Sequence, residues 1–234
     1  MVKTALFSGR DIVIKKNLAG LEKDLINRIK TGYPRVQNVI LCSVKPDDPL
    51  LVDMLRQCFG YVLILDENTP VPVKNMYQTP GTLGKDRLAG VVGANNIYPD
   101  RNVLIIDAGT AITYDVVDDQ NRYIGGNISP GLTMRFRALH DFTGRLPLVE
   151  PKTEVPFLAG NTEDAIAGGV QNGIVFEMDS CITLFKKKFK DLIIIFTGGD
   201  AEFFDKKLKS TIFVDPDLIL RGLNRILIYN VENK

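Results

Sequence analysis

The chain has 234 residues, 45% of them hydrophobic, and its 29 basic and 28 acidic residues give a formal net charge of +1. This length allows one large domain or two of about 100 residues. The balanced charge lacks the basic excess of nucleic-acid-binding proteins, and every apolar run is too short to span a bilayer, so we expect neither a nucleic-acid nor a membrane partner. Three widely spaced cysteines without a CxxC pair argue against a disulfide framework or zinc site and favour the cytoplasm.

Residues 1–99 are predicted to form a first α/β half. Alternating and apolar stretches predict strands near 2–7, 11–16, 36–42 and 61–65, and amphipathic periodicity predicts helices near 18–30, 50–59 and 84–95. A Pro-rich loop covers 69–82. The turn cluster 98–100 is where we place the boundary between the halves.

Residues 100–234 are predicted to form a second α/β half. Three strands near 102–107, 111–117 and 122–128 precede helices near 131–140 and 161–188, a strand at 192–197, and a final strand and helix, the latter at 216–229. The final helix carries apolar residues at helical spacing, which is typical of a core or dimer surface. Both halves thus read as a strand meander followed by alternating helices and strands.

The two halves also resemble each other in sequence. Residues 1–7, MVKTALF, are similar to residues 111–117, AITYDVV, which follow a DAGT turn that the first half lacks. If the halves are duplicates, a further strand and phosphate turn are expected upstream of Met1, since the meander otherwise loses an interior strand. The alternative is that the chain starts with an edge hairpin and that the similarity arose by chance.

Residues 103–117, VLIIDAGTAITYDVV, are the most informative stretch. An apolar run ends at Asp107, and a tight turn follows. In this turn Gly109 lets backbone N–H groups approach an anion and Thr110 can donate a hydrogen bond, while Asp107 can hold a cation. This pattern predicts a nucleotide phosphate site. The competing interpretation is that Asp107 only satisfies the backbone of its own turn.

Residues 77–87, YQTPGTLGKDR, form the second dense group. A helix N-terminus attracts an anionic ligand, Arg87 can hold a carboxylate through two hydrogen bonds, and Asp86 is placed to accept a hydroxyl proton. In the competing interpretation, Asp86 complements the helix dipole and Arg87 is a solvated surface charge.

Three further segments open helices. Residues 124–132, IGGNISPGL, and 196–201, FTGGDA, each follow a predicted strand and could bring backbone donors to phosphates, although turn chemistry alone explains single examples. In residues 160–166, GNTEDAI, Asn161 or Thr162 is a candidate N-cap. Lone His140 lies near no acid and nucleophile that would complete a triad, so we expect a surface or packing role.

In order along the chain, the segments YxxPxxLGxDR, DxGTxxTxD, GGxIxPGL, NTxxAIxxG and TGGDA resemble those of the type III pantothenate kinases. The resemblance implies an α/β protein with the duplicated actin-like ATPase (ribonuclease H-like) fold, two mixed sheets flanked by helices and an active site in the cleft between the halves. It also implies a homodimer that phosphorylates pantothenate with ATP and Mg²⁺ in the first step of coenzyme A synthesis.

The resemblance assigns roles to individual residues. Asp86 would accept the proton of the pantothenate hydroxyl, and Asp107 would bind a monovalent cation, K⁺ or NH₄⁺. The substrate pocket would be lined by Tyr77, Gly84, Lys85, Asp86, Arg87 and Thr162. ATP would contact Lys3, Gly109, Thr110, Gly198 and Gly199.

One family motif is only partly present. Of the first phosphate motif, DxGNTxxK, residues 1–3 supply the last three positions, and Lys3 keeps its place. The natural product is therefore expected to begin about ten residues earlier, the length of one short strand and its turn.

The expected reaction is in-line transfer of the γ-phosphoryl group to a primary hydroxyl. Two alternatives are a kinase of the same fold acting on another small hydroxyl or carboxylate substrate, and a non-catalytic or accessory regulatory relative. A DNA-binding regulator would need a basic stripe, and the most basic run, residues 185–190, is more typical of a solvated helix end.

Overall fold

The computed structural model describes residues 2–18, 20, 23–43 and 48–234, and these form two compact units. The first unit comprises residues 1–97 and 217–234, and the second comprises residues 98–216. The boundary expected at 99/100 thus lies at 97/98, and the C-terminal helix belongs to the first unit instead of the second half. No helix in the described ranges is long and apolar enough to cross a membrane.

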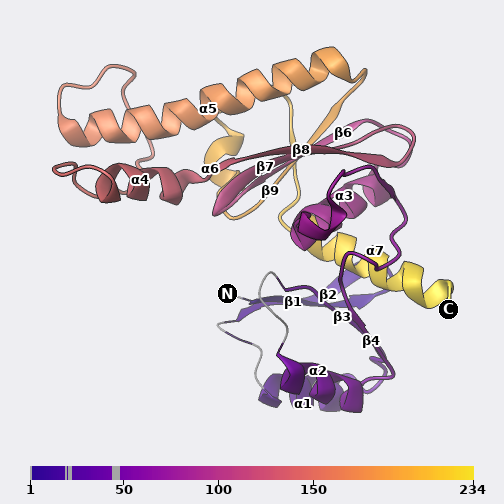
Figure 1. Ribbon diagram of the computed structural model, residues 1–234. Coiled ribbons are helices and arrows are strands. Elements are labelled where there is room, and N and C mark those ends of the chain that lie inside the picture. Colours follow the sequence, from indigo (N-terminus) through magenta and orange to yellow (C-terminus); the bar gives the residue numbers. More distant parts are fainter. Residues whose placement is uncertain (1, 19, 21–22, 44–47) are drawn as a thin grey trace. The chain divides into compact units, whose positions relative to one another are not determined.

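The first unit contains two separate two-stranded sheets (Figure 1). Strands β1 (Val2–Ser8) and β2 (Asp11–Leu18) form an antiparallel hairpin, and β3 (Asn38–Leu41) and β4 (Tyr61–Ile64) pair in parallel. Helices α1 (Lys23–Gly32) and α2 (Pro49–Cys58) enclose a small core with Ile26, Leu55 and Phe59. Strand β5 (Lys74–Asn75) and the 3-10 helix η1 (Pro80–Thr82) lie in the loop that follows β4.

Two packed helices complete the first unit. Helix α3 (Lys85–Ile97) is buried along most of its length, and α7 (Leu218–Glu232) packs against it. Their backbones meet at Gly93 and Gly222, where neither position leaves space for a side chain. This close crossing explains why α7 joins the first unit. A helix was expected over 18–30, but β2 extends to Leu18 and α1 begins at Lys23, with residues 19, 21 and 22 outside the described residues.

The strands of the second unit lie in one sheet in the order β10-β9-β6-β7-β8. Its strands are β6 (Val103–Ala108), β7 (Ala111–Val117), β8 (Arg122–Pro130), β9 (Ile193–Thr197) and β10 (Phe213–Val214). Strand β6 is interior, since it pairs antiparallel with β7 and parallel with β9. Its four buried residues 103–106 explain the continuous apolar run, because a strand covered on both faces needs no polar alternation.

Strand β6 has no counterpart in the described part of the first unit. The hairpin β1–β2 corresponds to β7–β8, and the parallel pair β3–β4 corresponds to β9–β10. In the second unit β6 joins these two groups of strands into one sheet, whereas no described strand joins them in the first. The arrangement of the strands therefore agrees with the predicted internal repeat.

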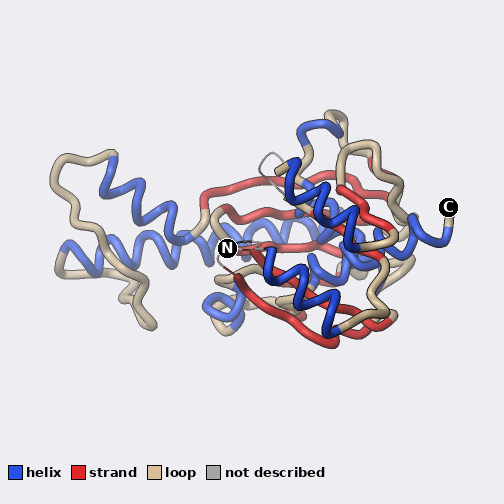
Figure 2. The backbone as a smooth tube through the Cα atoms, turned by 90° about the horizontal axis from the view of Figure 1, so that it is seen from below, coloured by secondary structure: helices blue, strands red, loops and turns tan. Residues whose placement is uncertain are grey.

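Helices of the second unit cover the sheet and extend beyond it. They are α4 (Leu132–Asp141), α5 (Thr162–Lys188) and α6 (Ala201–Asp205). The core beneath α5 includes Ile174, Met178 and Phe196, all fully buried. Figures 1 and 2 both show α4, the first part of α5 and the loop between them projecting past the ends of the strands. We call this projection, residues 132–165, the arm.

Candidate functional site

The N-terminus of α3 carries the predicted proton acceptor. Asp86 lies in the first turn of the helix, and its Oδ1 accepts the N–H of Arg87 at 2.9 Å. A Cβ atom at position 84 would lie only 2.6 Å from this oxygen, which explains the glycine there. Asp86 therefore does interact with the N-terminus of α3, as the helix-dipole interpretation expected. None of the hydrogen bonds among the described residues uses Oδ2, so one carboxylate oxygen can still accept a proton.

Arg87 and Tyr77 come together beside Asp86. The Arg87 guanidinium carbon lies 5.5 Å from the centre of the Tyr77 ring, a cation–π distance. Arg87 is only 8% exposed, so the interpretation of this residue as a solvated surface charge is wrong. Asn75 accepts the Tyr77 N–H at 3.0 Å and thereby fixes the loop that carries the ring. Lys85 and Gly84, half-buried, complete this end of the helix.

Lys3 lies on β1, opposite Asn17 of β2. Its side chain is exposed, and within the described residues it forms no ion pair. The structure therefore places Lys3 at the surface of the hairpin.

In the second unit, the predicted phosphate turn connects β6 and β7. The Gly109 N–H donates to the Ala111 carbonyl at 3.0 Å, which closes a tight turn. Thr110 is exposed at its tip and Asp107 is half-buried at its base. The turn therefore presents a hydroxyl and a carboxylate at the carboxyl end of an interior strand, where ligands bind in open α/β sheets.

A second glycine-rich loop lies directly beside this turn. Strands β6 and β9 pair in parallel with Asp107 opposite Thr197, so the loop after Thr197 leaves the sheet at the same edge. Gly198 has φ of +100°, and a side chain there would collide with the Ala108 carbonyl and with Asp107 Oδ1. The Asp200 N–H then donates to the Ala108 carbonyl at 2.9 Å.

Asp200 is a residue of this site to which the sequence assigned no role. Burial raises the pKa of its carboxyl group, so the loop places a carboxyl in a partly desolvated position next to the phosphate turn. The TGGD pattern contained the signal, because an acid follows the two glycines immediately after a strand.

The third glycine-rich segment packs on the same turn. The Gly131 N–H donates to the Thr110 carbonyl at 3.1 Å, and a side chain at position 131 would collide with the Gly109 and Thr110 carbonyls. Segments that the sequence presented separately, at 107–110, 129–131 and 197–200, are thus neighbours in the fold.

Thr162 lies elsewhere. It is the exposed first residue of α5, where Asn161 is the N-cap and accepts the Asp164 N–H at 2.9 Å. Glu177, fifteen positions later on the same helix, bonds to Ser129 beside the phosphate turn. Fifteen residues of α-helix span about 22 Å, so Thr162 is remote from the turn. It belongs to the arm, on which Figure 1 shows the start of α5.

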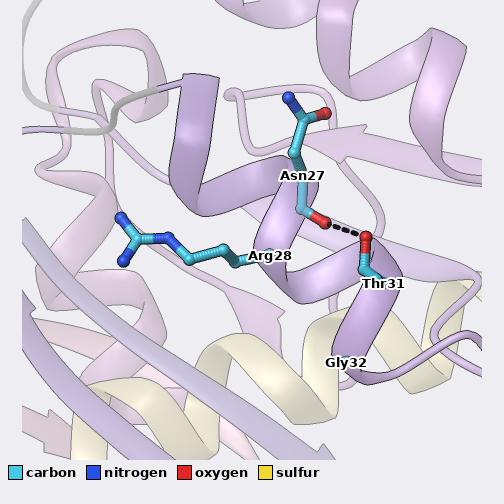
Figure 3. Close-up of a pocket in the computed structure, with 4 residues that line it drawn as sticks. All are labelled: Asn27, Arg28, Thr31 and Gly32. Carbon is cyan, nitrogen blue, oxygen red and sulfur yellow. Dashed lines mark hydrogen bonds between the residues drawn. The ribbon is translucent and has the colours of Figure 1, made fainter.

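Two surface hollows of the first unit contain none of the predicted site residues. One, of about 580 Å³, lies on α1, and Figure 3 shows Thr31 bonded to the Asn27 carbonyl while Arg28 extends away from them. The other, of about 190 Å³, is lined by Arg10, Asp11, Asn96, Ile97, Arg221, Asn224, Arg225 and Ile228. Its arginines lie by the carboxyl end of α3, where cations complement the helix dipole.

The donor atoms near the phosphate turn suit hard cations. Asp107 and Asp200 supply carboxylate oxygens, the ligands that Mg²⁺ and K⁺ prefer over nitrogen or sulfur. Among the described residues no group of three or more His, Cys, Asp and Glu could enclose a metal ion. Mg²⁺ is commonly held by one or two carboxylates and by substrate phosphates, and Asp107 and Asp200 offer such carboxylates.

Comparison with known proteins agrees with this arrangement. A family model described as type III pantothenate kinase matches residues 3–183. A type III pantothenate kinase of Bacteroides fragilis is 45% identical over 230 residues, covering 98% of this chain and 94% of the relative. That of Phocaeicola vulgatus is 44% identical over 230 residues, covering 98% and 95%.

Two solved structures share the fold. A Campylobacter jejuni protein, proposed to be a Baf family transcriptional activator, has a TM-score of 0.58 and 25% identity, with 84% of each chain covered. A ROK family protein from Streptococcus pneumoniae, solved with sucrose, has a TM-score of 0.50 and 9% identity, with 99% and 96% covered. The second similarity concerns the fold alone.

Proposed function

This chain belongs to the type III pantothenate kinase family, and we propose that it transfers the γ-phosphoryl group of ATP to the hydroxyl group of pantothenate, giving 4'-phosphopantothenate. This reaction is the first step of coenzyme A synthesis. Because it consumes ATP, which the cytoplasm supplies, we expect a cytoplasmic enzyme. The observation that carries the proposal is the α3 N-terminus, where an acid with one uncommitted oxygen lies beside a buried arginine.

Asp86 is the proposed proton acceptor. In a phosphoryl transfer the attacking hydroxyl must lose its proton, and a carboxylate within hydrogen-bond reach can accept it. Oδ1 of Asp86 is held by the Arg87 N–H, which fixes the carboxylate and leaves Oδ2 for the substrate.

Arg87 and Tyr77 are proposed to bind the pantothenate carboxylate. A guanidinium binds a carboxylate through two parallel hydrogen bonds, and the Tyr77 ring limits the orientations that Arg87 can take. Gly84 and Lys85 would complete this pocket, the first by leaving space and the second by adding positive charge. A neutral sugar would not need this charge.

The ATP phosphates are proposed to bind at the phosphate turn and the adjoining loop. Gly109, Gly198 and Gly199 allow backbone N–H groups to approach anionic oxygens, and Thr110 can donate its hydroxyl. Lys3 is a further candidate phosphate contact, supported by its exposed ammonium group on β1 and its place in the family motif.

Mg²⁺ and a monovalent cation, K⁺ or NH₄⁺, are the proposed cofactors. Asp107 would hold the monovalent cation, and Asp200 is available for Mg²⁺ together with the phosphates. When bound, these ions would neutralise the negative charge that develops on the phosphate oxygens during transfer.

A homodimer is proposed, with the arm as its interface. Phe142, Phe157 and Leu158 on the arm are 88%, 87% and 89% exposed. Three large apolar side chains exposed on one projection indicate a surface that another protein covers. A second copy of this chain would cover it in a symmetric dimer. Thr162 lies on the same projection, which is compatible with a substrate contact made across such an interface.

An accessory regulatory role is the second candidate, favoured by the similarity to the Campylobacter jejuni protein. The two functions are separated by incubating the purified chain with ATP, Mg²⁺ and pantothenate, with and without K⁺, and measuring ADP and phosphorylated pantothenate. Glucose and acetate serve as control acceptors. A phosphorylated product that forms with pantothenate, but not with glucose or acetate, supports the proposal. If the chain only hydrolyses ATP, or phosphorylates only another acceptor, pantothenate is not its substrate. Absence of all turnover favours the regulatory role.

A further inference from the structure

A half-buried carboxylate on α5 connects three elements around the phosphate turn. Glu177 Oε1 accepts the Tyr114 hydroxyl of β7 at 2.9 Å. Glu177 Oε2 accepts the Ser129 hydroxyl at 3.1 Å and the Arg135 guanidinium of α4 at 2.5 Å. None of the phosphate-binding loops contains Glu177 or Arg135.

Arg135 extends this network to the end of β8. Its Nε donates to the Pro130 carbonyl at 2.8 Å, and its Nη2 donates to Ser129 Oγ at 2.9 Å. One planar guanidinium thus holds two consecutive residues and a carboxylate, a geometry that an ammonium group cannot reproduce.

The residues that Arg135 holds are in direct contact with the turn. Pro130 is paired with Ala111, and the next residue, Gly131, donates its N–H to the Thr110 carbonyl at 3.1 Å. Because position 131 has no space for a Cβ atom against Gly109 and Thr110, a displacement of residues 129–131 must displace the turn as well.

The network is charged at neutral pH. Burial alone would raise the pKa of Glu177, but hydrogen bonds from Arg135, Tyr114 and Ser129 hold it below its ordinary value. Burial and the charge of Glu177 raise the pKa of Tyr114, which therefore donates as a neutral phenol. Charge-assisted bonds of this kind are strong, and removing one partner leaves the other without compensation.

We propose that Glu177 and Arg135 are positioning residues for nucleotide binding: by fixing residues 129–131 they hold the turn 109–110 in the conformation that receives the ATP phosphates. This inference rests on the proposed binding of ATP at that turn. It assigns a role to two residues that do not contact the nucleotide. Small displacements of positioning groups have large effects on enzymes, about 100-fold for 1 Å.

The test compares Glu177→Gln with Asp118→Asn. Asp118 also pairs with an arginine, Arg122, at 2.6 Å in the same unit, but it follows the far end of β7 and makes no bond to residues 129–131. We expect E177Q to weaken MgATP binding, measured by calorimetry without acceptor, about tenfold or more, and to raise KM for ATP but not for pantothenate. D118N should bind MgATP as the parent chain does.

Arg135→Lys provides a second variant that keeps the cation beside Glu177 but loses the forked contact. It should weaken MgATP binding, and it stands in for E177Q if that variant fails to fold. Unchanged MgATP affinity in the folded variants, with binding intact in the parent chain, overturns the positioning role alone. Equal losses in D118N and E177Q overturn it too, because they indicate general destabilisation. A parent chain that does not bind MgATP overturns both this role and the proposed function.

Discussion

The Arg87 guanidinium lies 5.5 Å from the centre of the Tyr77 ring, and the backbone N–H of Arg87 donates to Asp86 Oδ1 at 2.9 Å. The Arg87–Tyr77 contact joins the loop after β5 to the first turn of α3, and it brings together two residues that we propose to bind the pantothenate carboxylate.

Tyr77→Leu should raise KM for pantothenate, while Tyr77→Phe should not. The phenyl ring of phenylalanine preserves the cation–π contact with Arg87, whereas leucine removes about 0.5–2 kcal/mol, equivalent to about two- to thirtyfold in affinity. Steady-state kinetics with varied pantothenate and saturating ATP measure the difference. Equal KM values for the two variants would show that the ring contact has no part in substrate binding.

Gly198→Ala should impair ATP binding, while Gly173→Ala should not. Position 198 has φ of +100° and contacts the Ala108 carbonyl, whereas a Cβ atom at position 173, within α5, meets no atom within 4 Å. The strain at 198 is worth about 1–3 kcal/mol. We expect a loss of MgATP affinity and a lower melting temperature for the first variant only. Similar behaviour of both would mean that the conformation of this loop does not govern nucleotide binding.

Charged substitutions on the arm should dissociate the proposed dimer. Replacing Phe157 and Leu158 together by lysine puts two charges into an apolar interface, which is expected to yield monomers in sedimentation velocity. Leu50→Lys is the control, because Leu50 is 80% exposed in the first unit. A parent chain that is already monomeric, or a double variant that still dimerises, would exclude the arm as the interface.

Glu177 should stabilise the fold in a pH-dependent way. Its pKa in the folded state is lowered from the ordinary value of 4.5, so its contribution is complete above that value and is lost as the pH falls through the folded pKa. The difference in unfolding free energy between the parent chain and E177Q, measured by urea titration with circular dichroism, should therefore shrink on acidification below pH 4.5.

Asp200 is the control, because its effect on stability should change with pH in the opposite direction. Burial raises its pKa, so ionising Asp200 above its ordinary value of 3.8 opposes folding, and the parent chain should lose stability relative to Asp200→Asn as the pH rises. The same pH trend for both variants would contradict the electrostatic account of these two carboxyl groups.

The sequence predicted most helices and strands because their patterns are local. The apolar run of β6 and the caps and periodicity of α5 need no knowledge of the rest of the chain. The membership of α7 in the first unit was not predictable, because an amphipathic helix shows which face is buried but not which element covers it. Its partner is α3, more than 100 positions earlier.

For the candidate site, the sequence indicated the separate segments but not the contacts between them. Glycine patterns located the turn at 107–110 and the neighbouring loop at 197–200, because turn residues can be recognised in short segments. Glu177 bonds to Arg135 across 42 positions, and no motif contains both residues. The only local signal was an acid in a mainly apolar stretch of α5, and Thr162 matched a motif although the fold carries it outward on the arm.

The most direct test of the central claim is turnover of pantothenate by Asp86→Asn, compared with Asp48→Asn. Asp48 also accepts a backbone N–H at the start of a helix, from Leu50 at 3.0 Å, and asparagine caps helices equally well. If Asp86 accepts the hydroxyl proton, D86N should lose about 10²- to 10⁴-fold in kcat with its MgATP affinity unchanged, and D48N should match the parent chain. A D86N variant that phosphorylates pantothenate at the parent rate would contradict the account.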